Sequence, residues 1–143
     1  MSDNRIRVVV ADDFRPFREG VVSLLKAEPD FEIVGQGDTA DDAIRLAMEH
    51  LPDLILLDIT MPGGGLQAAQ AIAAACPVTK IVMLTAFGEE EDVTYALKVG
   101  AQGYILKDVA ARELVRILRA VWAGETYVTP ALGAGRRPAA TRL

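Results

Sequence analysis

The sequence predicts an α/β domain in which five helices cover both faces of a five-stranded parallel sheet, a doubly wound arrangement. Short apolar runs alternate with longer amphipathic stretches five times along the chain, as expected of strand–helix units that form a parallel sheet. About half of the residues are apolar (51%) and 24% are charged, which is typical of globular proteins. The length of 143 residues suits one domain with a single core.

Five short runs rich in leucine and β-branched residues are expected to be strands. They lie near residues 6–11, 31–35, 54–57, 80–84 and 103–106. The longest apolar runs are far shorter than the roughly 20 residues that a transmembrane helix requires, so no membrane span is expected.

The stretches between and after these runs predict helices near residues 14–27, 41–50, 66–75, 90–99 and 111–123. Thr39 can cap the second helix, the acidic residues 89–91 suit the positive end of the fourth, and Gly100 can stop it. His50, the only histidine, is expected to cap carbonyl groups at the end of the second helix rather than bind a metal.

Charge and cysteine content narrow the class of function. Fifteen Lys and Arg against 20 Asp and Glu give a net charge of −5, which disfavours nucleic-acid binding. The N-terminus lacks the layout of a secretory signal, so we expect a cytoplasmic protein. The single cysteine, Cys76, is expected to be a small core residue.

Polar side chains follow four of the five predicted strands. They are Asp12 and Asp13 after the first, Asp58 after the third, Thr85 after the fourth and Lys107 after the fifth. Because the carboxyl ends of parallel strands meet at one edge of a sheet, these side chains should converge there. An acid that caps a helix is the alternative interpretation of Asp12 or Asp13 taken alone.

Three converging carboxylates repel one another unless a cation offsets their charge. Oxygen ligands without a nearby histidine or cysteine favour Mg²⁺ over zinc. With a carboxylate nucleophile, a lysine and a threonine hydroxyl, such a site suits phosphoryl transfer, in which positioning and charge neutralisation supply most of the catalysis.

Four segments together resemble the motifs of response-regulator receiver domains. They are Val-Val-Ala-Asp-Asp (9–13), Leu-Leu-Asp-Ile-Thr-Met-Pro (56–62), Met-Leu-Thr-Ala (83–86) and Gly-Tyr-Ile-Leu-Lys (103–107). The resemblance covers about residues 5–125, and residues 11–20, 100–107 and 123–130 are most similar to the NarL/FixJ-type subgroup. It implies a flavodoxin-like (CheY-like) fold.

The resemblance also implies a role for each site residue. Asp58 would accept a phosphoryl group from a phosphohistidine on a sensor histidine kinase. Asp13 and Asp58 would bind Mg²⁺ directly, Asp12 mainly through water, and Thr60 through its backbone carbonyl. Thr85 and Lys107 would contact the phosphoryl oxygens. Tyr104 would be the switch aromatic, although composition alone favours a half-buried strand residue there.

Such a protein is a signalling phosphoacceptor with only self-catalysed phosphoryl transfer and autodephosphorylation, not an enzyme. In the family it is also a possible homodimer, although the apolar stripe of the last predicted helix is more typical of core. Residues 1–125 would form the receiver and residues 126–143 a linker or tail. We expect that tail to lead to a DNA-binding output domain for transcription regulation that is absent from this chain; the alternative is a stand-alone regulator.

The sequence departs from the family pattern at two places. Asp108 stands where many relatives have proline, and it is expected to cap the last helix instead. Residues 61–66 form a loop one residue shorter than usual, which predicts a mobile loop and a looser metal shell.

Three other functions remain open. An aspartate-nucleophile phosphatase of the haloacid dehalogenase type needs a second aspartate where Thr60 stands, so turnover should be poor. A nucleotide-binding module could use the glycines at 63–65, but the rest of a phosphate-loop motif is missing. A degenerate receiver would act by protein contacts without phosphorylation.

Overall fold

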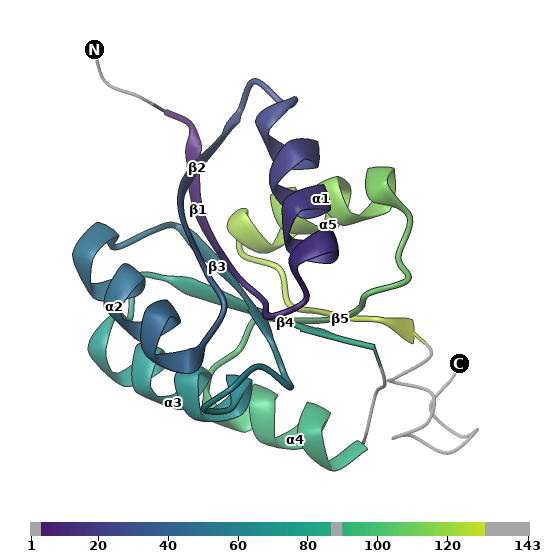
Figure 1. The fold of residues 1–143 in the computed structure, drawn as a ribbon. Helices are drawn as coiled ribbons and strands as arrows, with labels where there is room; N and C mark the ends of the chain where they lie inside the picture. The colour runs from purple at the N-terminus through teal and green to yellow at the C-terminus, as the bar shows by residue number, and fades with distance from the viewer. Residues whose placement is uncertain (1–3, 87–89, 131–143) are drawn as a thin grey trace.

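The computed structural model describes residues 4–86 and 90–130. Its elements in chain order (Figure 1) are β1 (Ile6–Ala11), α1 (Arg15–Lys26), β2 (Phe31–Gly37), α2 (Ala40–His50), β3 (Leu54–Asp58), α3 (Gly65–Ala75), β4 (Lys80–Thr85), α4 (Glu90–Val99), β5 (Gly103–Leu106), α5 (Ala111–Trp122) and β6 (Tyr127–Val128). The five predicted strands and five predicted helices are confirmed.

All strand pairs are parallel, and the sheet has the order β2-β1-β3-β4-β5-β6. Helices α1 and α5 cover one face, and α2, α3 and α4 cover the other (Figure 1). Alternate residues of each central strand enter the two cores: in β3, Leu54 and Leu56 pack under α1 and α5, while Ile55 and Leu57 face the opposite layer. Every central strand is thus buried on both sides, which explains its uninterrupted apolar run.

The sixth strand was not predicted. It lies within the 126–143 segment that the sequence assigns to a linker or tail, and it pairs in parallel with β5. Thr129 adds two bonds beyond the strand: its N–H donates to the Tyr104 carbonyl (3.0 Å), and its hydroxyl accepts from the Leu106 N–H (3.2 Å). The start of this segment is therefore part of the sheet.

Several local predictions are confirmed. The Thr39 hydroxyl accepts from the Asp42 N–H at 3.0 Å and caps α2. Gly100 follows α4 with φ +115°, a conformation that favours glycine. Cys76 is buried in the core. In α5, Leu114 and its apolar neighbours are buried, whereas Trp122 at the end of the stripe is 45% exposed.

Two capping predictions are wrong. Arg7, not His50, satisfies the carbonyl groups at the end of α2, because its Nη1 donates to the carbonyls of His50 (2.8 Å) and Leu51 (3.3 Å). Helix α5 begins after Ala110 and has no side-chain cap, so Asp108 does not cap it. The acidic residues 89–91 were expected to stabilise the start of α4, but residue 89 and the side chains of residues 90 and 91 lie outside the described part.

Among the residues described, none of the helices is both long enough and apolar enough to span a membrane.

Arg119 ties α5 to the turn between α1 and β2. Its guanidinium donates two hydrogen bonds to Asp30 (2.8 and 2.9 Å) and one to Glu28 (2.7 Å). The carbon of this guanidinium also lies 5.6 Å from the centre of the Phe31 ring. The bonds from Arg119 hold the pKa of Asp30 below its ordinary value of 3.8.

We predict that Arg119→Gln lowers the free energy of unfolding by about 1 kcal/mol at pH 7, near the upper end for exposed ion pairs because the contact is bidentate. Since the pKa of Asp30 is lowered in the folded state, its share of this loss should be complete above pH 3.8 and should shrink as the pH falls below that value. Urea unfolding at several pH values measures the effect.

Arg116→Gln is the matched control, because the ion pair that Arg116 makes is with Glu113, three residues away on the same helix, and not with another element. Equal losses of unfolding free energy in the two variants would show that the bonds from Arg119 to Asp30 and Glu28 stabilise the fold no more than an ion pair within one helix.

Candidate functional site

The structure brings the predicted polar residues to one edge of the sheet. Asp12 and Asp13 follow β1, Asp58 ends β3 and Thr85 ends β4, while Lys107 follows β5 directly. The Lys107 N–H donates to the Thr85 carbonyl at 2.8 Å, which fastens the ends of β4 and β5 together. The parallel order of the strands therefore brings the three carboxylates and Lys107 together and places Thr85 at the end of the next strand.

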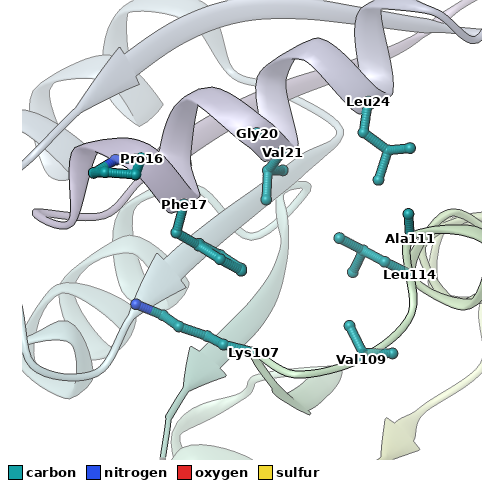
Figure 2. A pocket seen from close by; sticks show the side chains of 9 residues that line it. All are labelled: Pro16, Phe17, Gly20, Val21, Leu24, Lys107, Val109, Ala111 and Leu114. Carbon is teal, nitrogen blue, oxygen red and sulfur yellow. The ribbon is translucent and has the colours of Figure 1, made fainter.

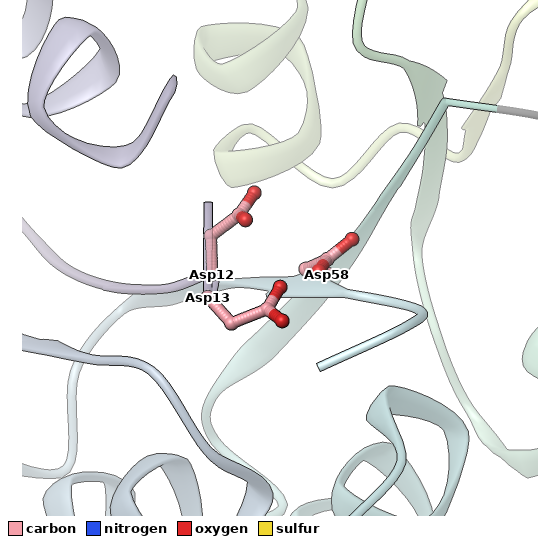
Figure 3. Close-up of side chains that lie close together, drawn as sticks. All are labelled: Asp12, Asp13 and Asp58. Atoms are coloured by element: carbon pink, nitrogen blue, oxygen red, sulfur yellow. The ribbon is translucent and has the colours of Figure 1, made fainter. Parts of the chain in front are cut away.

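Three carboxylates form the centre of the site (Figure 3). Asp12, Asp13 and Asp58 each offer an oxygen, and these three atoms lie within 4.8 Å of one another. Asp12 and Asp58 are buried, with 0% and 1% of their surface exposed, whereas Asp13 is exposed. Buried carboxylates this close together require a compensating cation.

Lys107 supplies one such cation. Its Nζ lies 2.7 Å from Asp12 Oδ2 and 3.1 Å from Asp58 Oδ1, and its side chain is only 15% exposed. Burial by itself lowers the pKa of Lys107, but the bonds to Asp12 and Asp58 outweigh burial and raise it. The ammonium therefore stays charged while it holds the two buried carboxylates.

The orientation of Asp12 is fixed by the start of α1. Its Oδ1 accepts a hydrogen bond from the Phe14 N–H at 2.8 Å, and its backbone carbonyl accepts from Arg18 Nη1 at 2.8 Å. Asp12 therefore closes the turn before α1 with one oxygen and faces Lys107 with the other. It is not the cap of the helix, because the N-cap position is Phe14, which has no side-chain cap bond.

The pKa of Asp13 is raised by its surroundings. Partial burial of its carboxyl group, its contact with Asp58 and the charges of Asp58 and Asp12 raise the pKa of Asp13 above 3.8. One lysine does not balance three carboxylates, and the exposed Asp13 is where the remaining repulsion acts.

Thr60 contacts Asp58 in a way that the sequence did not predict. Its hydroxyl lies 3.3 and 3.5 Å from the two Asp58 carboxylate oxygens. The expected role of Thr60 was through its backbone carbonyl, whereas the structure places its side chain beside the acid as well.

Thr85 and Tyr104 lie on the neighbouring strands β4 and β5. Thr85 is 3% exposed, and Tyr104 is completely buried in the core beneath α2, α3 and α4. The half-buried position that composition favours for Tyr104 is therefore wrong. Its ring already points inward.

A hollow of about 500 Å³ opens beside Asp13, Asp58 and Lys107. Its lining consists of Asp13, Phe14, Phe17, Asp58, Thr60, Ala86, Lys107 and Asp108. Sequence reasoning missed the two phenylalanines and the alanine, because only the packing of α1 and the position of the loop after β4 bring them here. One indication of their place in the site was present in the sequence: the phenylalanines lie one and four residues after Asp13, and the alanine directly follows Thr85.

The loop after Asp58 passes very close to that residue's own backbone. The Gly65 N–H donates to the Ile59 carbonyl at 3.0 Å, and the Gly64 N–H donates to the Met61 carbonyl at 2.9 Å. A Cβ atom added at Gly65 would overlap the Asp58 carbonyl oxygen. The predicted mobility of this loop stays a prediction, but its turn is closed by its own hydrogen bonds.

Comparison with known proteins gives consistent matches. A model of the response regulator receiver domain matches residues 8–119. The transcriptional regulatory protein DegU of Brevibacillus brevis is 37% identical over 131 residues, 91% of this chain and 56% of DegU. The oxygen regulatory protein NreC of Staphylococcus epidermidis is 40% identical over 125 residues, 86% of this chain and 57% of NreC. The chain thus spans little more than half the length of these curated relatives.

Solved structures agree with the sequence matches. The signal receiver domain of the response regulator NarL from Mycobacterium tuberculosis superposes with a TM-score of 0.82 at 38% identity, covering 85% of this chain and 99% of that domain.

We predict that Gly65→Ala costs about 2 kcal/mol of stability, because the new methyl group must push the start of α3 away from β3. Gly20→Ala is the matched control. Gly20 lies within α1 with nothing within 4 Å of an added Cβ, so this change should raise stability by about 0.5 kcal/mol or more. Thermal and urea unfolding test both; equal stabilities would contradict the close approach of Gly65 to Asp58.

We also predict that Asp13→Asn stabilises the metal-free protein at pH 7, by on the order of 0.5 kcal/mol because the exposed carboxylate is screened. An acid whose pKa is raised on folding opposes folding once the pH exceeds its unfolded value, here 3.8. The gain should therefore be present at neutral pH and disappear at about pH 3 and below. Unfolding in the presence of a chelator measures it, and a loss of stability at pH 7 would contradict the repulsion inferred for this cluster.

Proposed function

The chain belongs to the response-regulator receiver domain family, in its NarL-type subgroup, and on that basis we propose that Asp58 accepts a phosphoryl group from a phosphohistidine of a sensor histidine kinase. The observation that carries this proposal is the position of Asp58 beneath the open hollow, between the Lys107 ammonium and two further carboxylates. The Asp58 carboxylate contacts the Lys107 ammonium and lines a hollow that can admit a phosphorylated side chain.

In the proposed reaction, an oxygen of Asp58 attacks the phosphorus atom of the phosphoimidazole. The new P–O bond forms as the P–N bond breaks, and the imidazole leaves with the electron pair and takes up a proton. The product is an acyl phosphate on Asp58. Lys107 and the Thr85 hydroxyl would neutralise and bind the phosphoryl oxygens, since charge neutralisation and positioning dominate such transfers.

The donor set fits Mg²⁺. Three carboxylate oxygens lie close enough to share one ion, and the raised pKa of Asp13 indicates negative charge that Lys107 leaves uncompensated. Asp13 and Asp58 would hold the ion directly, Asp12 mainly through water, and Thr60 through its carbonyl group. A bound Mg²⁺ supplies further neutralisation of the phosphoryl charge.

Phosphorylation adds nearly two negative charges at the end of β3. The neighbouring positions of Thr85 and Tyr104 support a response of both, because Thr85 ends the strand next to β3 and pairs with Leu106, two residues from Tyr104. We propose that Thr85 moves toward the phosphoryl group and that Tyr104, held inward, stabilises the shifted arrangement. The domain is then a two-state signalling element with only self-catalysed transfer and autodephosphorylation.

The output is proposed from the relatives, whose names describe transcriptional and oxygen regulation. Residues 1–125 would act as the receiver and residues 126–143 as the connection to an output domain that binds DNA. A homodimer of phosphorylated receivers is a further proposed partner state.

We predict that the wild type gains one phosphoryl adduct on incubation with acetyl phosphate and Mg²⁺, and that Asp58→Asn gains none while its fold is retained. Chelation of Mg²⁺ should suppress the adduct on the wild type. Intact-mass spectrometry measures the adduct and circular dichroism checks the fold.

Asp53→Asn is the control for a second aspartate of the same segment, since Asp53 directly precedes the opposite end of β3, where its side chain accepts a hydrogen bond from the Arg7 N–H. It should be labelled like the wild type. Labelling that persists in Asp58→Asn would identify another acceptor. A wild type that takes up no phosphoryl group from acetyl phosphate or from its kinase would favour a receiver that acts by protein contacts alone.

A further inference from the structure

A second hollow lies beside the phosphoacceptor site, between α1 and the segment that connects β5 to α5 (Figure 2). It has a volume of about 280 Å³ and a mainly apolar lining. The lining residues are Pro16, Phe17, Gly20, Val21, Leu24, Lys107, Val109, Ala111 and Leu114. Of these, Phe17 and Lys107 also line the hollow over Asp58. These two side chains therefore stand at the boundary between the two spaces.

Phe17 and Lys107 contact each other at this boundary. The Lys107 Nζ lies 4.9 Å from the centre of the Phe17 ring, within the range of a cation–π attraction. The same nitrogen lies 2.7 Å from Asp12 and 3.1 Å from Asp58. An aromatic face and two carboxylates thus hold the ammonium together.

Phe17 is itself held in place. It is partly buried and packs against the core formed by α1 and α5, so its ring is anchored by the helix and not by Lys107. A lysine side chain is long and flexible, and an open hollow beside it offers other positions for its stem and its charge. The ring makes the position next to the carboxylates more favourable than those alternatives.

We propose that Phe17 is a positioning residue for phosphoryl transfer, acting through Lys107; this inference rests on the function proposed for Asp58. Transfer converts one of the two carboxylates that hold the ammonium into an acyl phosphate, so the contact between Lys107 and Asp58 must rearrange. Asp12 and the Phe17 ring are the contacts that remain, and together they keep the ammonium beside the phosphorus while the bond forms. An aliphatic residue could fill the same space but would not attract the cation.

The test compares Phe17→Leu, which keeps apolar volume without the ring, with Phe17→Tyr, which keeps the ring. We expect phosphorylation by acetyl phosphate to slow about three- to tenfold in Phe17→Leu, the range that loss of a cation–π contact allows, and to stay within about twofold of wild type in Phe17→Tyr. Leu24→Ala is the control, because Leu24 lines the far part of the same hollow, away from Lys107 (Figure 2). It should leave the rate unchanged.

A second readout does not depend on phosphorylation. A ring next to the Lys107 side chain shifts the NMR signals of its terminal methylene group upfield, and only three other lysines compete with it for assignment. We expect this shift in the wild type and in Phe17→Tyr, and its loss in Phe17→Leu. The loss would appear whether or not the protein is phosphorylated.

Two results would overturn the inference: equal phosphorylation rates in Phe17→Leu and the wild type, or an equal slowing in Leu24→Ala, which would reduce the effect to packing. A wild type that shows the NMR shift but is never phosphorylated would instead overturn the function on which the inference rests. The two failures are therefore distinguishable.

Discussion

Two buried carboxylates held by one buried ammonium are the interaction on which the rest of this edge of the sheet depends. Charges removed from water are tolerated only when they are paired with opposite charges, and Asp12, Asp58 and Lys107 meet that condition through ion-pair contacts of 2.7 and 3.1 Å. The three residues end or directly follow three different strands, so the pairing requires the parallel order of the sheet. The turn into α1 and the close approach of α3 to Asp58 follow from the same need, because each fixes the backbone beside a buried acid.

Much of this arrangement could be predicted from the sequence, and the reason is periodicity. Uninterrupted apolar runs identify strands buried on both faces, and parallel strands carry their last residues to one edge. The sequence alone therefore predicts that Asp58 and Lys107 lie together. What could not be predicted depends on contacts between distant segments. Arg7 reaches the end of α2 across 43 residues, β6 is two residues long and defined by pairing with β5, and the contact of Phe17 with Lys107 depends on how α1 packs.

The site also shows a conflict between stability and function. Three carboxylates face one lysine, and the raised pKa of Asp13 records the imbalance. A protein selected only for stability would replace one of these acids, since an uncompensated charge opposes folding. The excess negative charge is useful only if the cluster binds a cation, including one that would accompany a phosphoryl group. The electrostatic imbalance is thus itself an argument that the cluster binds something.

The short strand β6 has a consequence for how separate molecules meet. A strand at the edge of a sheet exposes unpaired N–H and C=O groups, which can recruit a strand from another chain and begin a growing ribbon. Here β5 is covered by β6, and the Thr129 hydroxyl takes the Leu106 N–H that would otherwise face outward. The new edge is only two residues long, too short to template a neighbour. On this side the sheet of the described residues is therefore protected against edge-to-edge pairing with another molecule, whereas the opposite edge is the longer strand β2.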